Sequence, residues 1–227
     1  MYGEIIYRNI ICNQYRSIKL LFIRMLQTLI ILLTTASYFY YHDSNWLGLK
    51  INRVPLINSI ITGVSSSIII WNNPDFYLEY KEKTDFYYAI PGIVLFAYSF
   101  YDLFYSIKEK NIDFFIHGLI AFFSGYIAFY INPSLSPALT YSCLTETSTI
   151  FLNLRVFRKR WLDYLFVVTF IFYRIFYIPY VTYLIYVSDA YENRDKYVIV
   201  IISHLFFGLN IYWLTLIIKK IICRHNV

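Results

Sequence analysis

The chain has 227 residues, of which 59% are hydrophobic, 22% are aromatic and only 15% are charged. Soluble domains carry about a quarter charged residues, so this composition excludes an ordinary soluble protein and favours one embedded in a membrane. The net charge of +6 does not indicate nucleic-acid binding, because the basic residues cluster at the ends of apolar segments. We therefore expect membrane lipids as partners and no nucleic acid.

Seven apolar segments are long enough to cross a bilayer, which takes about 20 residues in a helix. In chain order they are Leu20–Tyr41, Val54–Trp71, Ala89–Ile107, Phe114–Ile131, Leu135–Leu154, Tyr164–Val187 and Tyr197–Ile222. Helices are the expected form because an isolated segment in lipid must satisfy its own backbone hydrogen bonds. The sequence therefore predicts an all-α, multi-pass membrane protein with about seven transmembrane helices.

Asparagine and proline mark several ends of these segments. Asn132-Pro133 ends the fourth segment, and Ser136-Pro137 opens the fifth. Pro179 lies inside the sixth segment, where it should kink the helix and free a carbonyl one turn earlier.

One membrane domain accounts for nearly the whole chain, since no soluble domain or low-complexity tract is recognisable. We expect residues 1–51 to hold one transmembrane helix, residues 52–222 to form a six-helix bundle, and residues 223–227 to be a short tail. The three cysteines form no Cys-x-x-Cys pair. We therefore expect no metal site, and we expect no cofactor.

Four ionisable side chains lie alone inside consecutive apolar segments: Asp102, His117, Glu146 and Arg174. A charge at mid-bilayer costs from about 2.5 to more than 10 kcal/mol, so such residues normally face the protein interior or a wet cavity. Arg174 is the only cation well inside the later segments, and Asp102 or Glu146 is its natural counter-ion. The bundle is therefore predicted to surround a polar cavity.

The fifth segment carries a stripe of polar residues. Ser142, Glu146, Thr149 and Asn153 follow the spacing i, i+4, i+7 and i+11, which is one face of a helix. This stripe predicts a surface shared with other helices inside the bundle. A hydrogen-bonded seam that only holds the helices together is the structural alternative.

Three other segments contribute polar positions. Tyr98 and Asp102 share a face of the third segment, so a phenol can donate to the carboxylate. His117 on the fourth segment can act as a general base, a nucleophile or a satisfied hydrogen-bond partner. Asn210 and Trp213 lie about one turn apart on the seventh segment.

Five short motifs follow one another along these segments. They are Tyr101-Asp102-Leu103, Phe115-Ile116-His117, the run from Leu144 to Arg155, Tyr173-Arg174-Ile175 and Asn210-Ile211-Tyr212-Trp213. In this order they resemble the TLC-domain proteins, over about Asn52 to Ile222. The resemblance implies a helical membrane bundle in the endoplasmic reticulum or a related endomembrane. TLC members include the ceramide synthases, which join an acyl chain from acyl-CoA to a sphingoid amine, while others influence phospholipid composition.

The motifs match the branch outside the ceramide synthases more closely. Ceramide synthases carry two adjacent histidines where this chain has His117-Gly118. They also carry acids where this chain has Thr149 and Asn153. In the other branch, a Glu, a Ser, an Asn and an Arg recur in the helix that here contains Glu146.

Two functions therefore stay open, and a third is less favoured. The first is a protein that binds or handles acyl lipids and influences membrane lipid composition. The alternative is an acyl-CoA-dependent N-acyltransferase with His117 as base or nucleophile, assisted by Asp102 or Glu146. The third is a proton-coupled carrier that uses the same three residues as a relay. The remaining candidates for the lipid cavity or polar centre are Ser142, Thr149, Asn153, Arg174, Asn210 and Trp213.

Overall fold

A computed structural model describes residues 24–40, 53–74 and 86–225, and within these ranges the chain forms helices and no strand. The elements after the helix of residues 24–40 are α2 (Arg53–Asn72), α3 (Phe86–Lys108), α4 (Ile112–Tyr126), η1 (Ile127–Ile131), η2 (Pro133–Leu135), α5 (Ser136–Ser142), η3 (Cys143–Thr145), α6 (Glu146–Leu154), η4 (Arg155–Phe157), α7 (Arg160–Phe170), η5 (Ile171–Tyr177), α8 (Ile178–Val187) and α9 (Asn193–His225). The predicted all-α fold is confirmed.

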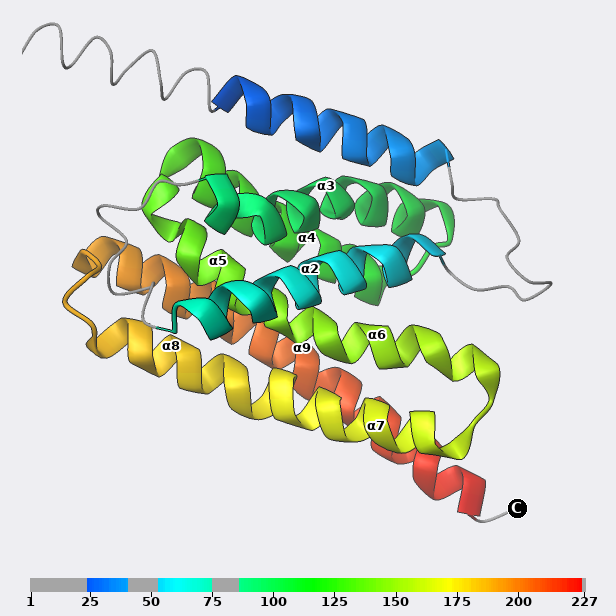
Figure 1. The fold of residues 1–227 in the computed structure, drawn as a ribbon. Helices are drawn as coiled ribbons and strands as arrows, with labels where there is room; N and C mark the ends of the chain where they lie inside the picture. Colours follow the sequence, from blue (N-terminus) through cyan, green and yellow to red (C-terminus); the bar gives the residue numbers. More distant parts are fainter. Residues whose placement is uncertain (1–23, 41–52, 75–85, 226–227) are drawn as a thin grey trace, which may run out of the picture.

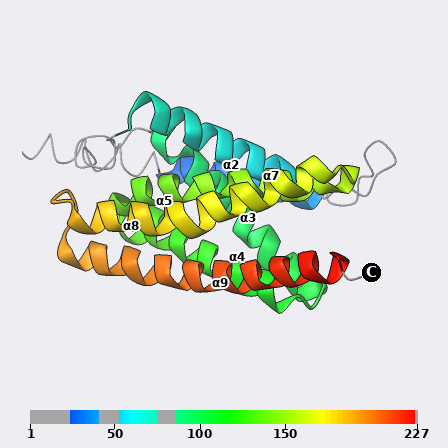
Figure 2. The same cartoon turned by 90° about the horizontal axis from the view of Figure 1, so that it is seen from below.

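The helices from α2 to α9 form a closed ring (Figures 1 and 2). Around the ring, α2 packs on α3, α3 on α4, α4 on α9, α9 on α8, α7 on α6, and α6 again on α2. The segments α5–η3–α6 and α7–η5–α8 each act as one member of the ring. The expected bundle of six helices is therefore confirmed.

The helix of residues 24–40 lies outside this ring against α3 (Figure 1). Its Thr35 hydroxyl donates to the Ala97 carbonyl at 3.2 Å, and its Tyr38 ring meets the Tyr98 ring edge-on at 5.9 Å. The expected span Leu20–Tyr41 also includes residues 20–23 and 41, which lie outside the described residues.

α3 is the most buried of the five long apolar helices. In its most apolar stretch 67% of the residues are buried, against 11% for α9, whose outer face is left to the membrane. Close packing with α4 depends on Gly125, because a Cβ there would lie 2.4 Å from ring carbon Cδ2 of Phe96. The glycine lets the two helices approach and fixes α3 beside α4.

Five helices among the described residues are long and apolar enough to span a membrane, where the sequence predicted seven spans. They are Val54–Asn72, Tyr88–Lys108, Ile112–Ile131, Arg160–Val187 and Asn193–Ile221. The expected fifth span, Leu135–Leu154, runs the length of the bundle (Figure 1) but is broken into α5, the tight 3-10 turn η3 and α6.

Hydroxyl side chains flank this break. The side chains of Ser142, Thr145 and Ser148 each donate to a backbone carbonyl three or four residues earlier, at 2.8–2.9 Å. Such bonds can bend a helix, but they also occur along α2, which is one regular helix. The span was expected as one helix and is found as two short ones joined by η3.

Pro179 is accommodated by a change in helix type. The seven residues Ile171–Tyr177 before it form a π-helix, in which hydrogen bonds span five residues instead of four. Proline has no N–H to donate to the carbonyl one turn earlier, so a regular α-helix is disfavoured here. Arg174 sits in the middle of this wide turn.

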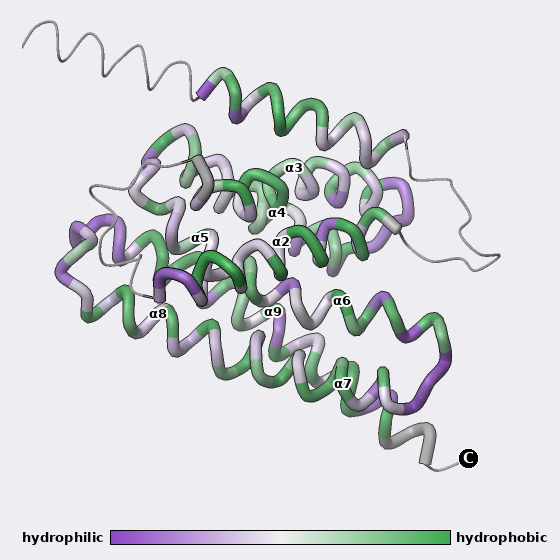
Figure 3. The backbone as a smooth tube through the Cα atoms, viewed as in Figure 1, coloured by the Kyte–Doolittle hydropathy of each residue, from purple (hydrophilic) through white to green (hydrophobic). Residues whose placement is uncertain are grey.

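Hydrophilic residues gather at the two ends of the ring, most visibly at the connection between α6 and α7 (Figure 3). We name the end that holds this connection and the last turns of α9 the C-terminal end. At the opposite end the Asp195 carboxylate accepts from Asn132 Nδ2 at 2.8 Å and from Ser134 Oγ at 3.0 Å. These bonds tie the start of α9 to the turn before α5.

Candidate functional site

Arg174 is held in the middle of the ring by four hydrogen bonds. Its Nε donates to Ser148 Oγ at 2.8 Å, and its Nη1 donates to Asn210 Oδ1 at 3.2 Å. Its Nη2 donates to Thr149 Oγ1 at 2.9 Å and to Glu146 Oε1 at 3.3 Å. Only 6% of the Arg174 side chain and 7% of the Glu146 side chain are exposed. The buried ion pair thus joins η5 to α6, and the hydrogen bond to Asn210 adds α9.

The second carboxylate has different partners. Asp102 Oδ2 lies 3.5 Å from His117 Nδ1, and Asp102 Oδ1 accepts from the Tyr98 hydroxyl at 3.3 Å. Asp102 and Tyr98 come from α3, and His117 comes from α4. The phenol–carboxylate bond expected on the third span is present. Of the two possible counter-ions, Glu146 pairs with Arg174, and Asp102 orients the imidazole.

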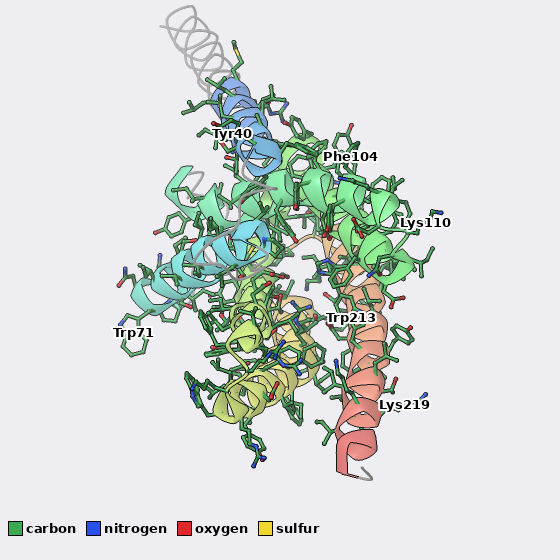
Figure 4. All side chains as sticks on the ribbon, turned by 90° about the vertical axis from the view of Figure 1, so that its right-hand side faces the viewer. Tyr40, Trp71, Phe104, Lys110, Trp213 and Lys219 are labelled. Carbon is green, nitrogen blue, oxygen red and sulfur yellow. The ribbon has the colours of Figure 1, made fainter. Side chains whose placement is uncertain are left out.

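An indole ring connects the two pairs. The ring of Trp213 on α9 lies 5.4 Å from the His117 ring and 5.8 Å from Cζ of Arg174. The Phe170 ring lies 5.6 Å from the same guanidinium carbon. Figure 4 views the molecule from the C-terminal end, with Trp213 on the inner side of α9 and Lys219 on its outer side. Two aromatic rings therefore lie beside the guanidinium, and both line the same space as Arg174.

A cavity of about 780 Å³ extends from the two pairs to the C-terminal end of the bundle. We call it the wide cavity. Its lining includes both carboxylates and their partners, the apolar residues Leu152, Phe166, Leu216 and Ile217, and four charged residues nearer the end, Glu109, Asp113, Arg155 and Lys220. Its volume lies within the range of about 300–1,000 Å³ typical of small-molecule sites.

A narrower cavity of about 70 Å³, here called the slot, starts from the same centre and continues toward the opposite end. His117, Glu146 and Arg174 line both cavities. Beyond them the slot is mostly apolar, with Leu95, Ala128, Leu139, Ile178 and Ile199 in its wall. The polar centre therefore stands at the junction of a wide, mixed cavity and a narrow, apolar one.

All nine predicted site residues line these two spaces. Asp102, His117, Glu146, Thr149, Asn153, Arg174 and Trp213 line the wide cavity, while Ser142 and Asn210 line the slot. The stripe on the fifth span is thus divided, because η3 changes the winding between Ser142 and Glu146. The functional roles of these residues stay predictions.

Ser148 belongs to the site, although the i, i+4 spacing did not select it. It is buried, and its hydroxyl accepts from Arg174 at 2.8 Å. Its place in the Leu144–Arg155 motif was the signal that could have identified it. Phe170 carried no such signal, because an aromatic residue in this sequence is ordinary.

The chemistry that the polar centre can perform depends on which of its groups are already hydrogen-bonded within the protein. Arg174 commits four of its five N–H donors to the protein, so its main task is to join helices. The imidazole of His117, oriented by a carboxylate through Nδ1, resembles the arrangement of a general base. No group of three or more His, Cys, Asp or Glu side chains within the described ranges could hold a metal ion.

Replacing Arg174 by leucine should lower the free energy of unfolding by about 3–5 kcal/mol, because Glu146 is then left buried without a counter-charge. Replacing both Arg174 and Glu146 by leucine should recover much of this loss. The matched control is Arg155→Leu, whose partner Asp163 is 39% exposed, and it should cost about 1 kcal/mol or less. SDS-induced unfolding in mixed micelles measures all three. Equal damage from the single and the double replacement would contradict the pair.

Comparison with known proteins indicates the family of the chain. The family model of the TLC domain matches residues 22–219, a range that includes the helix of residues 24–40 and every candidate site residue. No curated protein and no solved structure gave a match. Since the model covers most of the chain, this membrane protein belongs to the TLC-domain family.

Proposed function

We propose that the protein binds an acyl lipid and thereby influences the lipid composition of an endomembrane such as the endoplasmic reticulum. The observation that carries the proposal is that the wide cavity and the slot meet at the polar centre, where His117, Glu146 and Arg174 line both. In our proposal, the polar part of the lipid lies in the wide cavity, and the first few carbons of its acyl chain enter the slot, which has room for no more than these.

The lining of each space supports this division. The wide cavity places two acids, Glu109 and Asp113, and two bases, Arg155 and Lys220, toward its end. Such a balanced set favours a neutral or zwitterionic head group over a strongly anionic one. The slot offers mainly aliphatic and small side chains, which suit an acyl chain.

Family membership supports a role in a membrane, and the choice of branch is our own inference. We place the protein outside the ceramide synthases because Gly118 follows His117, where those enzymes carry a second histidine. Thr149 and Asn153 stand where those enzymes carry acids. In this chain Thr149 bonds Arg174, and Asn153 donates to the Thr149 carbonyl at 2.8 Å.

The His117–Asp102 contact favours one alternative, an acyl-CoA-dependent N-acyltransferase. In that reaction the amine nitrogen attacks the thioester carbonyl carbon, the carbon–sulfur bond breaks, and the thiolate of CoA leaves. The amine proton passes to the imidazole of His117 and then to the thiolate. Asp102, rather than Glu146, would stabilise the imidazolium, since it lies against Nδ1 at 3.5 Å.

Blocking the wide cavity should remove bound lipid. Ile217 lines this cavity, whereas its neighbour Ile218 is 47% exposed on the outer side of α9. We expect Ile217→Trp to reduce co-purified lipid by about tenfold, because the indole fills space that the ligand occupies. Ile218→Trp, the matched control, should retain wild-type occupancy. Native mass spectrometry of the purified protein counts the bound lipids.

Two outcomes of this comparison would contradict lipid binding in the wide cavity. The first is wild-type protein that carries no lipid in native mass spectra. The second is equal occupancy in Ile217→Trp and Ile218→Trp, which would place bound lipid on the outer surface instead.

A CoA-release assay with purified protein, acyl-CoA and a sphingoid base separates binding from catalysis. Our proposal predicts no release above background from the wild type. An acyltransferase would release CoA, and His117→Ala or Asp102→Asn would reduce the rate by about 100-fold or more. His204→Ala is the control, because that histidine is exposed and lies outside both cavities. Release that only the His117 and Asp102 variants abolish would establish the alternative.

A further inference from the structure

In the side-chain amide of Asn210, the oxygen is hydrogen-bonded and the nitrogen is not. Oδ1 accepts from Arg174 Nη1 at 3.2 Å, and the residue is 1% exposed. Nδ2 is buried and has no acceptor among the described residues. The two ends of the amide cannot be exchanged, because a guanidinium only donates and the amide oxygen must therefore face it. The two N–H groups of Nδ2 are thus held away from Arg174 with nothing to bond.

A buried donor without an acceptor is unfavourable, and such groups in proteins usually meet a ligand, an ion or water. Asn210 lines the slot beside Glu146 and Arg174, at the point where the polar centre gives way to the apolar wall. Arg174 fixes the amide in position through its hydrogen bond. Nδ2 can therefore donate a hydrogen bond to an acceptor atom of a ligand that enters the slot.

We propose that Nδ2 of Asn210 donates to the carbonyl oxygen of the bound acyl lipid, an inference that rests on the lipid-binding function proposed above. A carbonyl stands at the head of an acyl chain, so this bond would place the first carbons of the chain in the apolar part of the slot. Asn210 is then the residue that selects acyl lipids over alkyl lipids, which have the same chain without the carbonyl.

A neutral acceptor fits this position better than a phosphate. The Arg174 charge is matched by Glu146 at 3.3 Å, and most of its donors are committed to the protein. Of the described residues that line the slot, Arg174 is the one Lys or Arg, so a phosphate there would be buried without a cation of its own. The carbonyl needs only the hydrogen bond that Asn210 offers.

Competition between an ester lipid and its ether analogue tests this assignment. The probes are 1-palmitoyl-lysophosphatidylcholine and 1-O-hexadecyl-lysophosphatidylcholine, which share the head group and chain length but differ in the carbonyl. They are offered together at equal concentration, below the onset of micelles, to the purified full-length protein. Native mass spectrometry reads both occupancies in one spectrum. We expect the wild type to prefer the ester by about tenfold.

Two variants locate the origin of this preference. Asn210→Asp keeps an oxygen for Arg174 but replaces the donating NH₂ by an oxygen, so the ratio should fall to about one. Ser203→Ala removes a hydroxyl from the same slot wall and should keep the preference. If Asn210→Asp fails to fold, the ratio measured for the wild type still decides.

The outcomes separate this inference from the function on which it rests. Equal occupancy of ester and ether on the wild type would overturn the carbonyl contact and leave lipid binding intact. That result would mean recognition through the shared hydroxyl or phosphate, with water satisfying Asn210. A preference that survives in Asn210→Asp would also overturn it. If neither lipid binds while wild-type protein retains co-purified lipid, the carbonyl contact is likewise overturned for this class of ligand. Absence of any bound lipid would overturn both.

Discussion

A guanidinium among membrane helices needs protein partners for both its charge and its donors, since lipid offers neither. Arg174 obtains them from Glu146, Ser148 and Thr149 on α6 and from Asn210 on α9. The position of each of these helices is therefore coupled to the others through one side chain. The π-helical turn η5, which precedes Pro179, carries Arg174 at its middle. The interior of the ring depends on this interaction.

The two intramembrane carboxylates have different partners. Glu146 balances Arg174, so the one strong cation of the polar centre is not free for a ligand. Asp102 instead lies between Tyr98 and His117 and leaves the imidazole directed by a single contact. In our proposal, recognition of the lipid then falls to His117, to the amide of Asn210 and to the apolar walls. This division favours a lipid with neutral polar groups near its chain, and it keeps one oriented imidazole within reach of the ligand.

The sequence was sufficient to predict the helical bundle and the residues at its centre. A solitary charge in an apolar span is costly in lipid and therefore normally faces the protein interior. The sequence could not choose between Asp102 and Glu146 as the partner of Arg174. That choice depends on how α3 and α6 are rotated within the ring, which helical spacing does not encode. Ser148 escaped prediction because it lies two residues after Glu146, off the stripe that the spacing selected. The unbonded Nδ2 of Asn210 emerges only from contacts across helices.

The most direct test of the coupling by Arg174 is a distance between α9 and the connection that joins α6 to α7. Spin labels at Lys159 and Lys219, both exposed at the C-terminal end, report this distance by pulsed electron resonance in nanodiscs. The wild type should give one narrow distribution. Arg174→Leu should broaden or lengthen it, because α9 then loses its hydrogen bond from η5 through Asn210. Identical distributions in the two proteins would contradict the account.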